Sequence, residues 1–305
     1  MNAADPLLSL RISVAYRNRP DVLRPDVLKD VSLQMERGEI LGLVGQSGSG
    51  KSTLALALLR LLHLKGGTVR GEIRFKGQDL LAWTEAQLRA LRGREISIVL
   101  QSPMSSLNPA LRIESQLREA WRAHASGSRD ECAAAIHNAL TSVSLPHESE
   151  FLRRRPSQLS VGQAQRVIIA MAILHRPALL IADEATSALD TITQSEILRL
   201  FAQLNRELGM GILYISHDLL SVAALCHRIA ILNAGEIVEC GAPSQIFGAP
   251  QHAYTQKLVA ALPSIPSRSV EDGKSSGHDT GGANDRGDSR AEYLRVSEKI
   301  PTTCN

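Results

Sequence analysis

The stretch Gly45-Gln46-Ser47-Gly48-Ser49-Gly50-Lys51-Ser52 carries the strongest local signal in this chain. It fits the pattern G-x-x-x-x-G-K-[ST], a loop whose backbone N–H groups form a cradle for phosphate groups. Residues 39–44 before it are an apolar run of strand length, and Thr53 to Leu64 after it has the pattern of a buried helix. Lys51 is expected to reach the β- and γ-phosphates of a nucleotide, and the Ser52 hydroxyl to bind Mg²⁺. The alternative is a glycine-rich turn beside a surface lysine.

Length and composition allow a full α/β core and argue against several classes of protein. The 305 residues suffice for one large or two small domains, and a net charge of +3 does not suggest a nucleic-acid surface. The four cysteines lie far apart without a C-x-x-C pair, so we expect reduced thiols and neither disulfides nor a zinc site. We expect no signal peptide and no membrane span, because no apolar run is long enough.

Hydrophobic periodicity divides the rest of the chain into strands and helices. The expected strands are residues 8–16, 27–35, 39–44, 68–75, 95–101, 178–182 and 211–215, with a hairpin over residues 228–239. The expected helices lie within residues 111–152, 160–175 and 193–208. Strands that alternate with helices favour a mostly parallel sheet. The expected fold class is α/β, a P-loop NTPase with a mostly parallel sheet, antiparallel strands at the N-terminus and an inserted helical subdomain.

The same patterns predict a single nucleotide-binding domain. We expect this domain over residues 1–262, with the helical insertion over about residues 102–175, and no internal repeat is evident. Ser, Gly, Asp and Arg dominate residues 263–305, which contain few large apolar side chains. A segment of this composition cannot bury enough apolar surface to fold, so we expect a low-complexity, disordered tail.

An acidic pair follows one of the predicted buried strands. The run Leu179-Leu180-Ile181-Ala182 is followed by Asp183 and Glu184. A phosphate-loop protein places at such a strand end the carboxylate that completes the Mg²⁺ shell, and Asp183 fits that place. Glu184 could then polarise a water molecule for attack on the γ-phosphate. The alternative is an acidic strand end that faces solvent.

Six motifs occur in the order found in ABC-transporter ATPases, and over roughly residues 8–262 the chain resembles that family. The matching segments are Gly45–Ser52, Gln101, Leu159–Gln163, Leu179–Glu184, Ser187–Asp190 and His217. In the family these are the phosphate loop, the Q-loop, the signature, the Mg²⁺-binding acidic strand, the D-loop and the switch histidine. The signature is followed by Gln165-Arg166, which makes the match hard to produce by chance.

The resemblance implies ATP and Mg²⁺ as ligands and assigns a role to each matching residue. The implied ATP-binding residues are Tyr16, Gly45, Gln46, Ser47, Gly48, Ser49, Gly50, Lys51, Ser52 and Thr53. The implied metal-binding residues are Ser52, Gln101 and Asp183. Glu184 would be the general base, His217 would contact the γ-phosphate, and Gln101 would contact metal and water. Tyr16 would stack on the adenine, and the alternative is an ordinary strand aromatic.

The signature has a geometric consequence. Ser160 and Gln163 have the spacing of a capping box, so a helix should begin at Ser160, and with Gly162 it would present a second anion site. In ABC ATPases this site binds the γ-phosphate held by the opposite subunit. The resemblance therefore implies a dimer that holds two ATP molecules between its subunits, with Asp190 in the D-loop. ATP would close the dimer and hydrolysis would open it.

Three residues depart from the family pattern. Val161 replaces the glycine that is usual in the signature, and a positive φ at a β-branched residue would cost about 1–3 kcal/mol. Ala185 replaces a common proline after Glu184, and Ser102 replaces a common aspartate after Gln101. We expect the fold to tolerate these three changes. They affect the rate of ATP hydrolysis more than they affect the fold.

Two further segments resemble one group within the family. Gln101-Ser102-Pro103-Met104-Ser105-Ser106-Leu107-Asn108-Pro109 is similar to the Q-D-P-M-x-S-L-N-P run of oligopeptide, dipeptide and nickel uptake ATPases. His252-Ala253-Tyr254-Thr255 is similar to the H-P-Y-T segment that closes the ATPase domain in that group, with Ala253 in place of its proline. Each segment could also be an ordinary loop or helix start.

This resemblance implies the ATP-hydrolysing subunit of a bacterial ABC importer, which takes up peptides or a related small solute such as a nickel chelate or an opine. The chain would lie on the cytoplasmic face of the inner membrane as a peripheral protein. Two permease subunits would dock near the Q-loop and the helical insertion. The other partners would be a second ABC ATPase, identical or related, and an extracytoplasmic solute-binding protein. We expect no nucleic-acid partner. The alternatives are a soluble, non-transport ABC-type regulatory ATPase and an ATP-binding partner that hydrolyses poorly.

Overall fold

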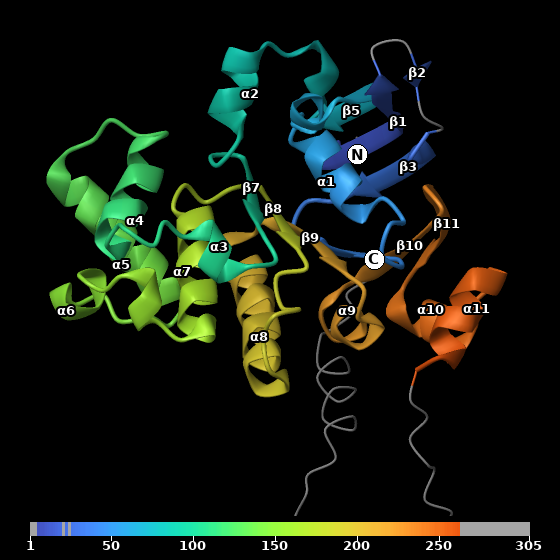
Figure 1. Cartoon of the computed structure of the whole chain (residues 1–305). Coiled ribbons are helices and arrows are strands. Elements are labelled where there is room, and N and C mark those ends of the chain that lie inside the picture. Colours follow the sequence, from blue (N-terminus) through green and yellow to red (C-terminus); the bar gives the residue numbers. More distant parts are fainter. Residues whose placement is uncertain (1–4, 20–21, 24–25, 263–305) are drawn as a thin grey trace, which may run out of the picture.

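The computed structural model describes residues 5–19, 22–23 and 26–262, which form two sheets with helices packed against them (Figure 1). The strands are β1 (Leu8–Arg19), β2 (Val22–Leu23), β3 (Leu28–Met35), β4 (Ile40–Val44), β5 (Gly67–Phe75), β6 (Gln78–Asp79), β7 (Ile96–Val99), β8 (Leu179–Asp183), β9 (Gly211–Ser216), β10 (Arg228–Asn233) and β11 (Glu236–Gly241). The α-helices are α1 (Lys51–Leu58), α2 (Glu85–Leu91), α3 (Pro103–Ser106), α4 (Ile113–Arg122), α5 (Arg129–Ser142), α6 (Ser149–Leu152), α7 (Val161–Ile173), α8 (Thr191–Leu208), α9 (Leu219–Leu225), α10 (Pro243–Gly248) and α11 (Ala253–Ala260). Three 3₁₀ turns are η1 (Leu62–Lys65), η2 (Leu80–Ala82) and η3 (Pro156–Gln158).

A six-stranded sheet with the order β11-β10-β4-β9-β8-β7 forms the centre of the molecule. Strands β10, β4, β9, β8 and β7 are parallel, and β11 pairs antiparallel with β10. The hairpin turns at Ala234 and Gly235, whose φ values of 48° and 85° fit the left-handed conformation of a two-residue hairpin loop. The mostly parallel sheet and this hairpin confirm the sequence-based expectations.

The N-terminal strands form a second, antiparallel sheet, as predicted. Strand β1 pairs with β2, β3 and β5, and β5 pairs with β6. The alternating apolar side chains of β1 are buried on one face, because successive residues of a strand point to opposite sides. Leu8, for example, is fully buried opposite Phe75 of β5 and Met35 of β3.

The central sheet is buried on both faces, which explains why its strands are continuous apolar runs. Leu41 and Leu43 of β4 pack into a core shared with α1 and the N-terminal sheet. Ile40 and Val44 of the same strand pack into a second core, formed with α7, α8 and α9. The phosphate loop follows β4, so it is anchored between two cores.

Helices α4, α5 and α6 form the inserted helical subdomain of the predicted fold. They lie between β7 and β8 in the sequence, on the side of the molecule opposite α10 and α11 (Figure 1). Helices α4 and α5 pack against α7, and α6 packs against α4. Leu117, Ile136 and Leu140 are buried in this contact. The predicted tail over residues 263–305 lies outside the described residues.

One expected helix is shorter than predicted. The helix expected over Thr53 to Leu64 begins at Lys51 and ends at Leu58, and Arg60 adopts a φ of 55°. The Arg60 amide donates to Ala57 and the Leu61 amide to Leu56, which is the bonding of a Schellman C-cap. The cap usually contains glycine, so the sequence did not show this helix end.

No helix in the described ranges is both long enough and apolar enough to cross a membrane. Cys132 and Cys226 are buried free thiols and Cys240 is an exposed one, whereas Cys304 lies outside the described residues.

Candidate functional site

The phosphate loop joins β4 to α1, and its glycines are required by close contacts. A Cβ on Gly45 would overlap the Leu232 carbonyl oxygen of β10 and lie 2.6 Å from Ser49 Oγ. Gly48 and Gly50 have φ values of 80° and 111°, which side chains other than glycine rarely adopt. No side chain caps the start of α1, so its first N–H groups face the loop without a side-chain acceptor. A helix start of this kind attracts anions.

Lys51 is the first residue of α1 and folds back over the loop. Its Nζ donates hydrogen bonds to the carbonyl oxygens of Gly45 at 2.7 Å and Gln46 at 3.0 Å. Burial lowers the pKa of Lys51, and the negative charges of Glu184 and Asp183 oppose this effect. The ammonium is therefore held at the loop, where it can contact a phosphate group.

Ser52 and Asp183 bring two hard oxygen ligands together at the end of β8. Ser52 Oγ donates to Asp183 Oδ1 at 3.4 Å. Burial raises the pKa of Asp183, the bond from Ser52 lowers it, and repulsion from Glu184 raises it further. A divalent cation would stabilise this partly buried charge, and Mg²⁺ prefers such oxygen ligands. These two residues therefore fit the predicted Mg²⁺ site.

Glu184 and His217 face each other across the sheet edge. Glu184 follows β8 with a φ of 49°, and its amide donates to Ile215 of β9 at 2.9 Å. His217 follows β9, and its Nδ1 lies 3.4 Å from Glu184 Oε1. Both line a cleft of about 410 Å³ together with Val44, Gly45, Gln46, Ser47 and Leu258. The parallel strands thus place these two groups beside the phosphate loop.

Two other predicted site residues, Tyr16 and Gln101, do not line this cleft. Tyr16 Oη lies 3.3 Å from Thr53 Oγ1 in the first turn of α1, and the ring is half-buried. The stacking of Tyr16 on adenine stays a prediction. Gln101 is exposed after β7 and does not line the cleft that Glu184 and His217 share. The structure therefore does not bring Gln101 together with these two groups.

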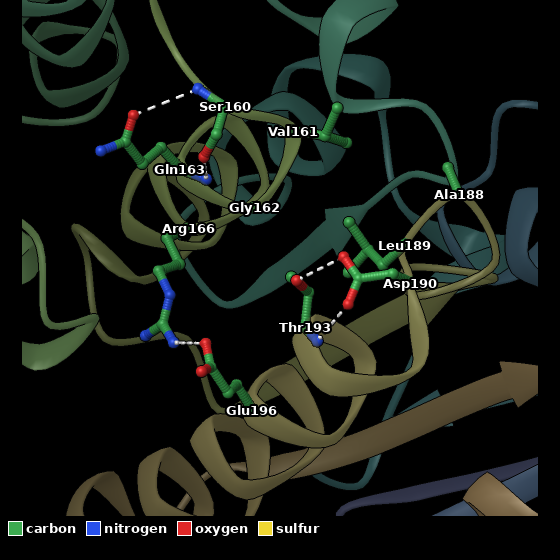
Figure 2. A pocket seen from close by; sticks show the side chains of 10 residues that line it. All are labelled: Ser160, Val161, Gly162, Gln163, Arg166, Ala188, Leu189, Asp190, Thr193 and Glu196. Atoms are coloured by element: carbon green, nitrogen blue, oxygen red, sulfur yellow. Dashed lines mark hydrogen bonds and ion pairs between the residues drawn. The ribbon is translucent and has the colours of Figure 1, made fainter.

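The signature forms the start of α7, as the capping box predicts (Figure 2). The Gln163 amide donates to Ser160 Oγ at 3.1 Å, and the Ser160 amide donates to Gln163 Oε1 at 3.1 Å. Val161 is the first residue of the helix, and its φ is not positive. The strain considered for a β-branched residue at this position therefore does not arise.

The D-loop lies beside the signature in Figure 2. Asp190 caps α8 by accepting from the Thr193 amide at 3.0 Å and from Thr193 Oγ1 at 2.7 Å. A Cβ on Gly162 would lie only 2.9 Å from Thr193 Cγ2, so glycine is needed for close packing of α7 on α8. Arg166 strengthens this contact, because its guanidinium donates to Glu196 at 3.1 Å and to the Val143 carbonyl at 2.9 Å.

The signature and the phosphate loop belong to separate pockets. The signature pocket is lined by Ser160, Val161, Gly162, Gln163, Arg166, Ala188, Leu189, Asp190, Thr193 and Glu196. None of these ten residues lines the cleft beside the phosphate loop. Within the described residues, the signature and the cleft beside the phosphate loop are therefore separate surfaces.

Two residues of α11, Tyr254 and Leu258, lie at the phosphate loop and its cleft without having been predicted as site residues. The Gln46 amide donates to Tyr254 Oη at 3.2 Å, and Leu258, four residues later on α11, lines the cleft. Glu239 fixes the start of this helix by accepting from the amides of Gln251 at 2.9 Å and His252 at 3.0 Å. The segment containing Tyr254 indicated a group within the family, but nothing in its pattern indicated this contact.

The glycine loop between β4 and α1, the acidic end of β8 and the capped start of α7 define an ATP-binding cassette on a P-loop fold. Residues 28–187 match the family model described as ABC transporter, which is about half of the chain. The chain therefore belongs to the ABC transporter family, and the predicted fold class and family resemblance are confirmed.

Relatives and solved structures support this assignment. The chain is 41% identical over 271 residues to the glutathione import ATP-binding protein GsiA of Salmonella paratyphi A, and equally to GsiA of Escherichia coli O157:H7. The alignments cover 87% of this chain but only 43% of each relative, so the chain spans less than half the length of these proteins. The dimeric ATP-binding cassette MJ0796 bound to ADP and Pi matches with a TM-score of 0.66 and 29% identity, covering 77% of this chain and 98% of that chain. CbiO1 of Clostridium perfringens, part of the transporter complex cbiONQ, matches with a TM-score of 0.68 and 26% identity, covering 85% and 96%.

Proposed function

We propose that this chain is the ATP-hydrolysing subunit of a bacterial ABC importer. The observation that carries the proposal is the grouping of Lys51, Asp183, Glu184 and His217 at one end of the central sheet. The lysine and both carboxylates are close enough to influence each other's charge, and Glu184 and His217 line one cleft beside the phosphate loop. This is the set of groups that ATP hydrolysis requires.

In the proposed reaction the phosphate loop and Lys51 bind the β- and γ-phosphates of ATP. Ser52 and Asp183 would hold Mg²⁺, which neutralises charge on the phosphate oxygens when bound. Glu184 accepts a proton from the water that attacks the γ-phosphorus, and ADP and phosphate leave. His217 lies 3.4 Å from Glu184 and can contact the γ-phosphate, so the two side chains would hold the water and the transferred group in line.

The separation of the two pockets supports a dimer. Ser160 lines a pocket that has no residue in common with the cleft beside the phosphate loop, so one chain presents the two as separate surfaces. The signature pocket of a second ATPase, identical or related, would complete the site from the opposite side. The similar cassette MJ0796 was solved as a dimer with ADP and Pi, which agrees with this arrangement.

We propose peptides or a related small solute as the cargo, because the GsiA relatives are glutathione import proteins. Two permease subunits and an extracytoplasmic solute-binding protein would be the other partners, and the chain would lie on the cytoplasmic face of the inner membrane. Leu100 and Met104, which flank Gln101, are 47% and 41% exposed. These apolar side chains support docking of a permease near the Q-loop.

The non-transport regulatory ATPase remains the second candidate, but no observation on the described residues favours it. The deciding experiment measures ATP-dependent uptake of glutathione and other short peptides in vesicles reconstituted with the permease subunits that copurify with this chain, using the chain or its Glu184→Gln variant. Uptake that requires Glu184 supports the importer. ATP hydrolysis without any permease association would instead support the regulatory ATPase.

A further inference from the structure

A buried set of hydroxyl groups lies on and next to the segments that carry the proposed catalytic pair. Tyr214 of β9 is fully buried, and Thr186, Ser216 and Ser221 are each at most 5% exposed. Tyr214 Oη lies 2.9 Å from Thr186 Oγ1 and 3.4 Å from Ser221 Oγ. Hydroxyl groups buried in an apolar core destabilise the fold unless they are hydrogen-bonded, so this set needs an explanation.

The hydrogen bonds of the set have one consistent direction. Ser221 Oγ donates to the Asp218 carbonyl at 2.9 Å, so it accepts from Tyr214 Oη. Tyr214 Oη then accepts from Thr186 Oγ1. Ser216 Oγ accepts from the Asp218 amide at 3.0 Å and lies 3.4 Å from Ser221 Oγ. Each hydroxyl group can therefore donate once, and the chain of bonds is fully satisfied.

This chain of bonds connects the two loops that carry the proposed catalytic groups. Thr186 comes two residues after Glu184, and Ser216 comes directly before His217. Tyr214 is the only one of the four hydroxyl residues with a long, rigid side chain, and it bridges Thr186 and Ser221 from within the sheet. Burial raises the pKa of Tyr214, so its phenol stays protonated and able to donate.

We propose that Tyr214 is a positioning residue for ATP hydrolysis. Its hydroxyl group holds the loop of Glu184 and the loop of His217 at a fixed separation, and so maintains the 3.4 Å contact between these two side chains. The inference rests on the proposed function, because it gives Tyr214 a role only through Glu184 and His217. Neither the phosphate loop nor Lys51 is part of the hydroxyl set, so nucleotide binding does not depend on it.

The test is Tyr214→Phe, which removes the hydroxyl group and keeps the ring that packs 6.2 Å from Phe201. We expect kcat to fall about ten- to a hundredfold while the KM for ATP stays unchanged, because misplaced groups slow the chemistry without affecting binding. Ser97→Ala is the matched control. Ser97 is a 3% exposed serine on β7 whose hydroxyl group donates to Gly93, away from both loops. This control should keep its kcat.

A second arm tests whether Tyr214 acts through Glu184 and His217. Tyr214→Phe is combined with Glu184→Gln and His217→Ala, and the residual rate is measured with radiolabelled ATP. If Tyr214 acts only through these two groups, adding Tyr214→Phe leaves the rate of the Glu184→Gln, His217→Ala protein unchanged. A further loss, or a fall in kcat that Ser97→Ala reproduces, overturns the proposal. Ser221→Ala provides an independent break in the same bonds and should lower kcat in the same way.

The two arms also distinguish this inference from the proposed function. If Glu184→Gln keeps the kcat of the unchanged protein, the proposed catalytic role of Glu184 fails. If Glu184→Gln abolishes hydrolysis and Tyr214→Phe has a normal kcat, only the positioning role of Tyr214 fails.

Discussion

Gly162 offers a way to separate the packing of the signature from its proposed contact with phosphate. Alanine should suit the backbone at this position, because Gly162 lies in α7 without a positive φ, and alanine favours a helix by about 1 kcal/mol over glycine. The added Cβ, however, would lie 2.9 Å from Thr193 Cγ2 of α8. Carbon atoms in unstrained contact are about 3.5–4.0 Å apart.

The expected result for Gly162→Ala is a small net loss of stability. Overpacking of this kind costs about 1–3 kcal/mol, and the gain in helix propensity offsets about 1 kcal/mol of it. A net loss of about 1 kcal/mol lowers the Tm of a chain this size by roughly 2–4 °C. Thermal unfolding followed by circular dichroism measures this shift.

Thr193→Ser provides the matched background. It removes the methyl group that the new Cβ meets and keeps the hydroxyl group that donates to Asp190 Oδ2 at 2.7 Å. On this background Gly162→Ala should no longer lower the Tm, and it should raise it slightly. An equal loss of Tm on both backgrounds would show that the contact with Thr193 does not determine the glycine.

The same double variant tests the proposed role in hydrolysis. If the γ-phosphate of the opposite subunit approaches the Gly162 backbone closely, the Cβ obstructs it even when the clash with Thr193 is relieved. We expect the stable double variant to hydrolyse ATP at least about tenfold more slowly, because a transition-state contact is lost. A normal rate would refute the close approach.

Three other predictions follow from the contacts of the site. Asp183→Asn should raise the Tm of the nucleotide-free protein at pH 7.5. Burial is the chief reason why the folded-state pKa of Asp183 is raised, so the stability that this carboxyl group contributes is fully present below the ordinary carboxyl pKa. That stability is lost as the pH rises through the raised pKa, and the neutral asparagine avoids the loss. The difference in Tm should therefore shrink toward pH 4, and a difference that is constant with pH would contradict the reasoning. Tyr254→Phe removes the hydroxyl group that accepts from the Gln46 amide at 3.2 Å. The KM for ATP in steady-state assays should rise about two- to tenfold, as expected for the loss of one hydrogen bond. An unchanged KM would show that α11 does not hold the phosphate loop. Arg92→Met removes the guanidinium that donates to the Leu59 carbonyl at 2.7 Å. Urea unfolding should show a loss of about 1–3 kcal/mol in the free energy of unfolding, while the KM for ATP stays constant as the control.

The sequence predicted the parts of the site that depend on local chemistry. The glycine pattern from Gly45 to Ser52 favours a strand–loop–helix geometry, and the three-residue spacing of Ser160 and Gln163 is typical of a capping box. For these segments the physical constraint lies within a few residues. The predicted and observed structures therefore agree.

Features that depend on distant residues were not predictable in the same way. Helix α1 ends at Leu58 because Arg60 adopts a left-handed conformation without glycine, and Arg92, more than thirty positions later in the chain, binds the carbonyl at the helix end. Likewise, Tyr214 reads as an ordinary apolar strand residue, and its bonds to Thr186 and Ser221 exist only in the folded chain. Tertiary contacts decide both, and no local pattern records them.

Complementation between two inactive variants tests most directly the claim that each ATP site is shared by two subunits. Lys51→Ala should prevent phosphate binding in the phosphate loop. Ser160→Asp keeps a good helix cap but places a negative charge in the signature pocket, and Ser160→Asn, a neutral cap, is its control. Each inactive variant alone should show almost no ATPase activity at any protein concentration.

In an equal mixture, half of the dimers would combine the intact phosphate loop of one variant with the intact signature of the other. We predict that such a mixture regains about a quarter of the activity of the unchanged protein, because one of two sites is restored in about half of the dimers. If the unchanged chain hydrolyses ATP and the mixture stays inactive, the two pockets do not form one shared site.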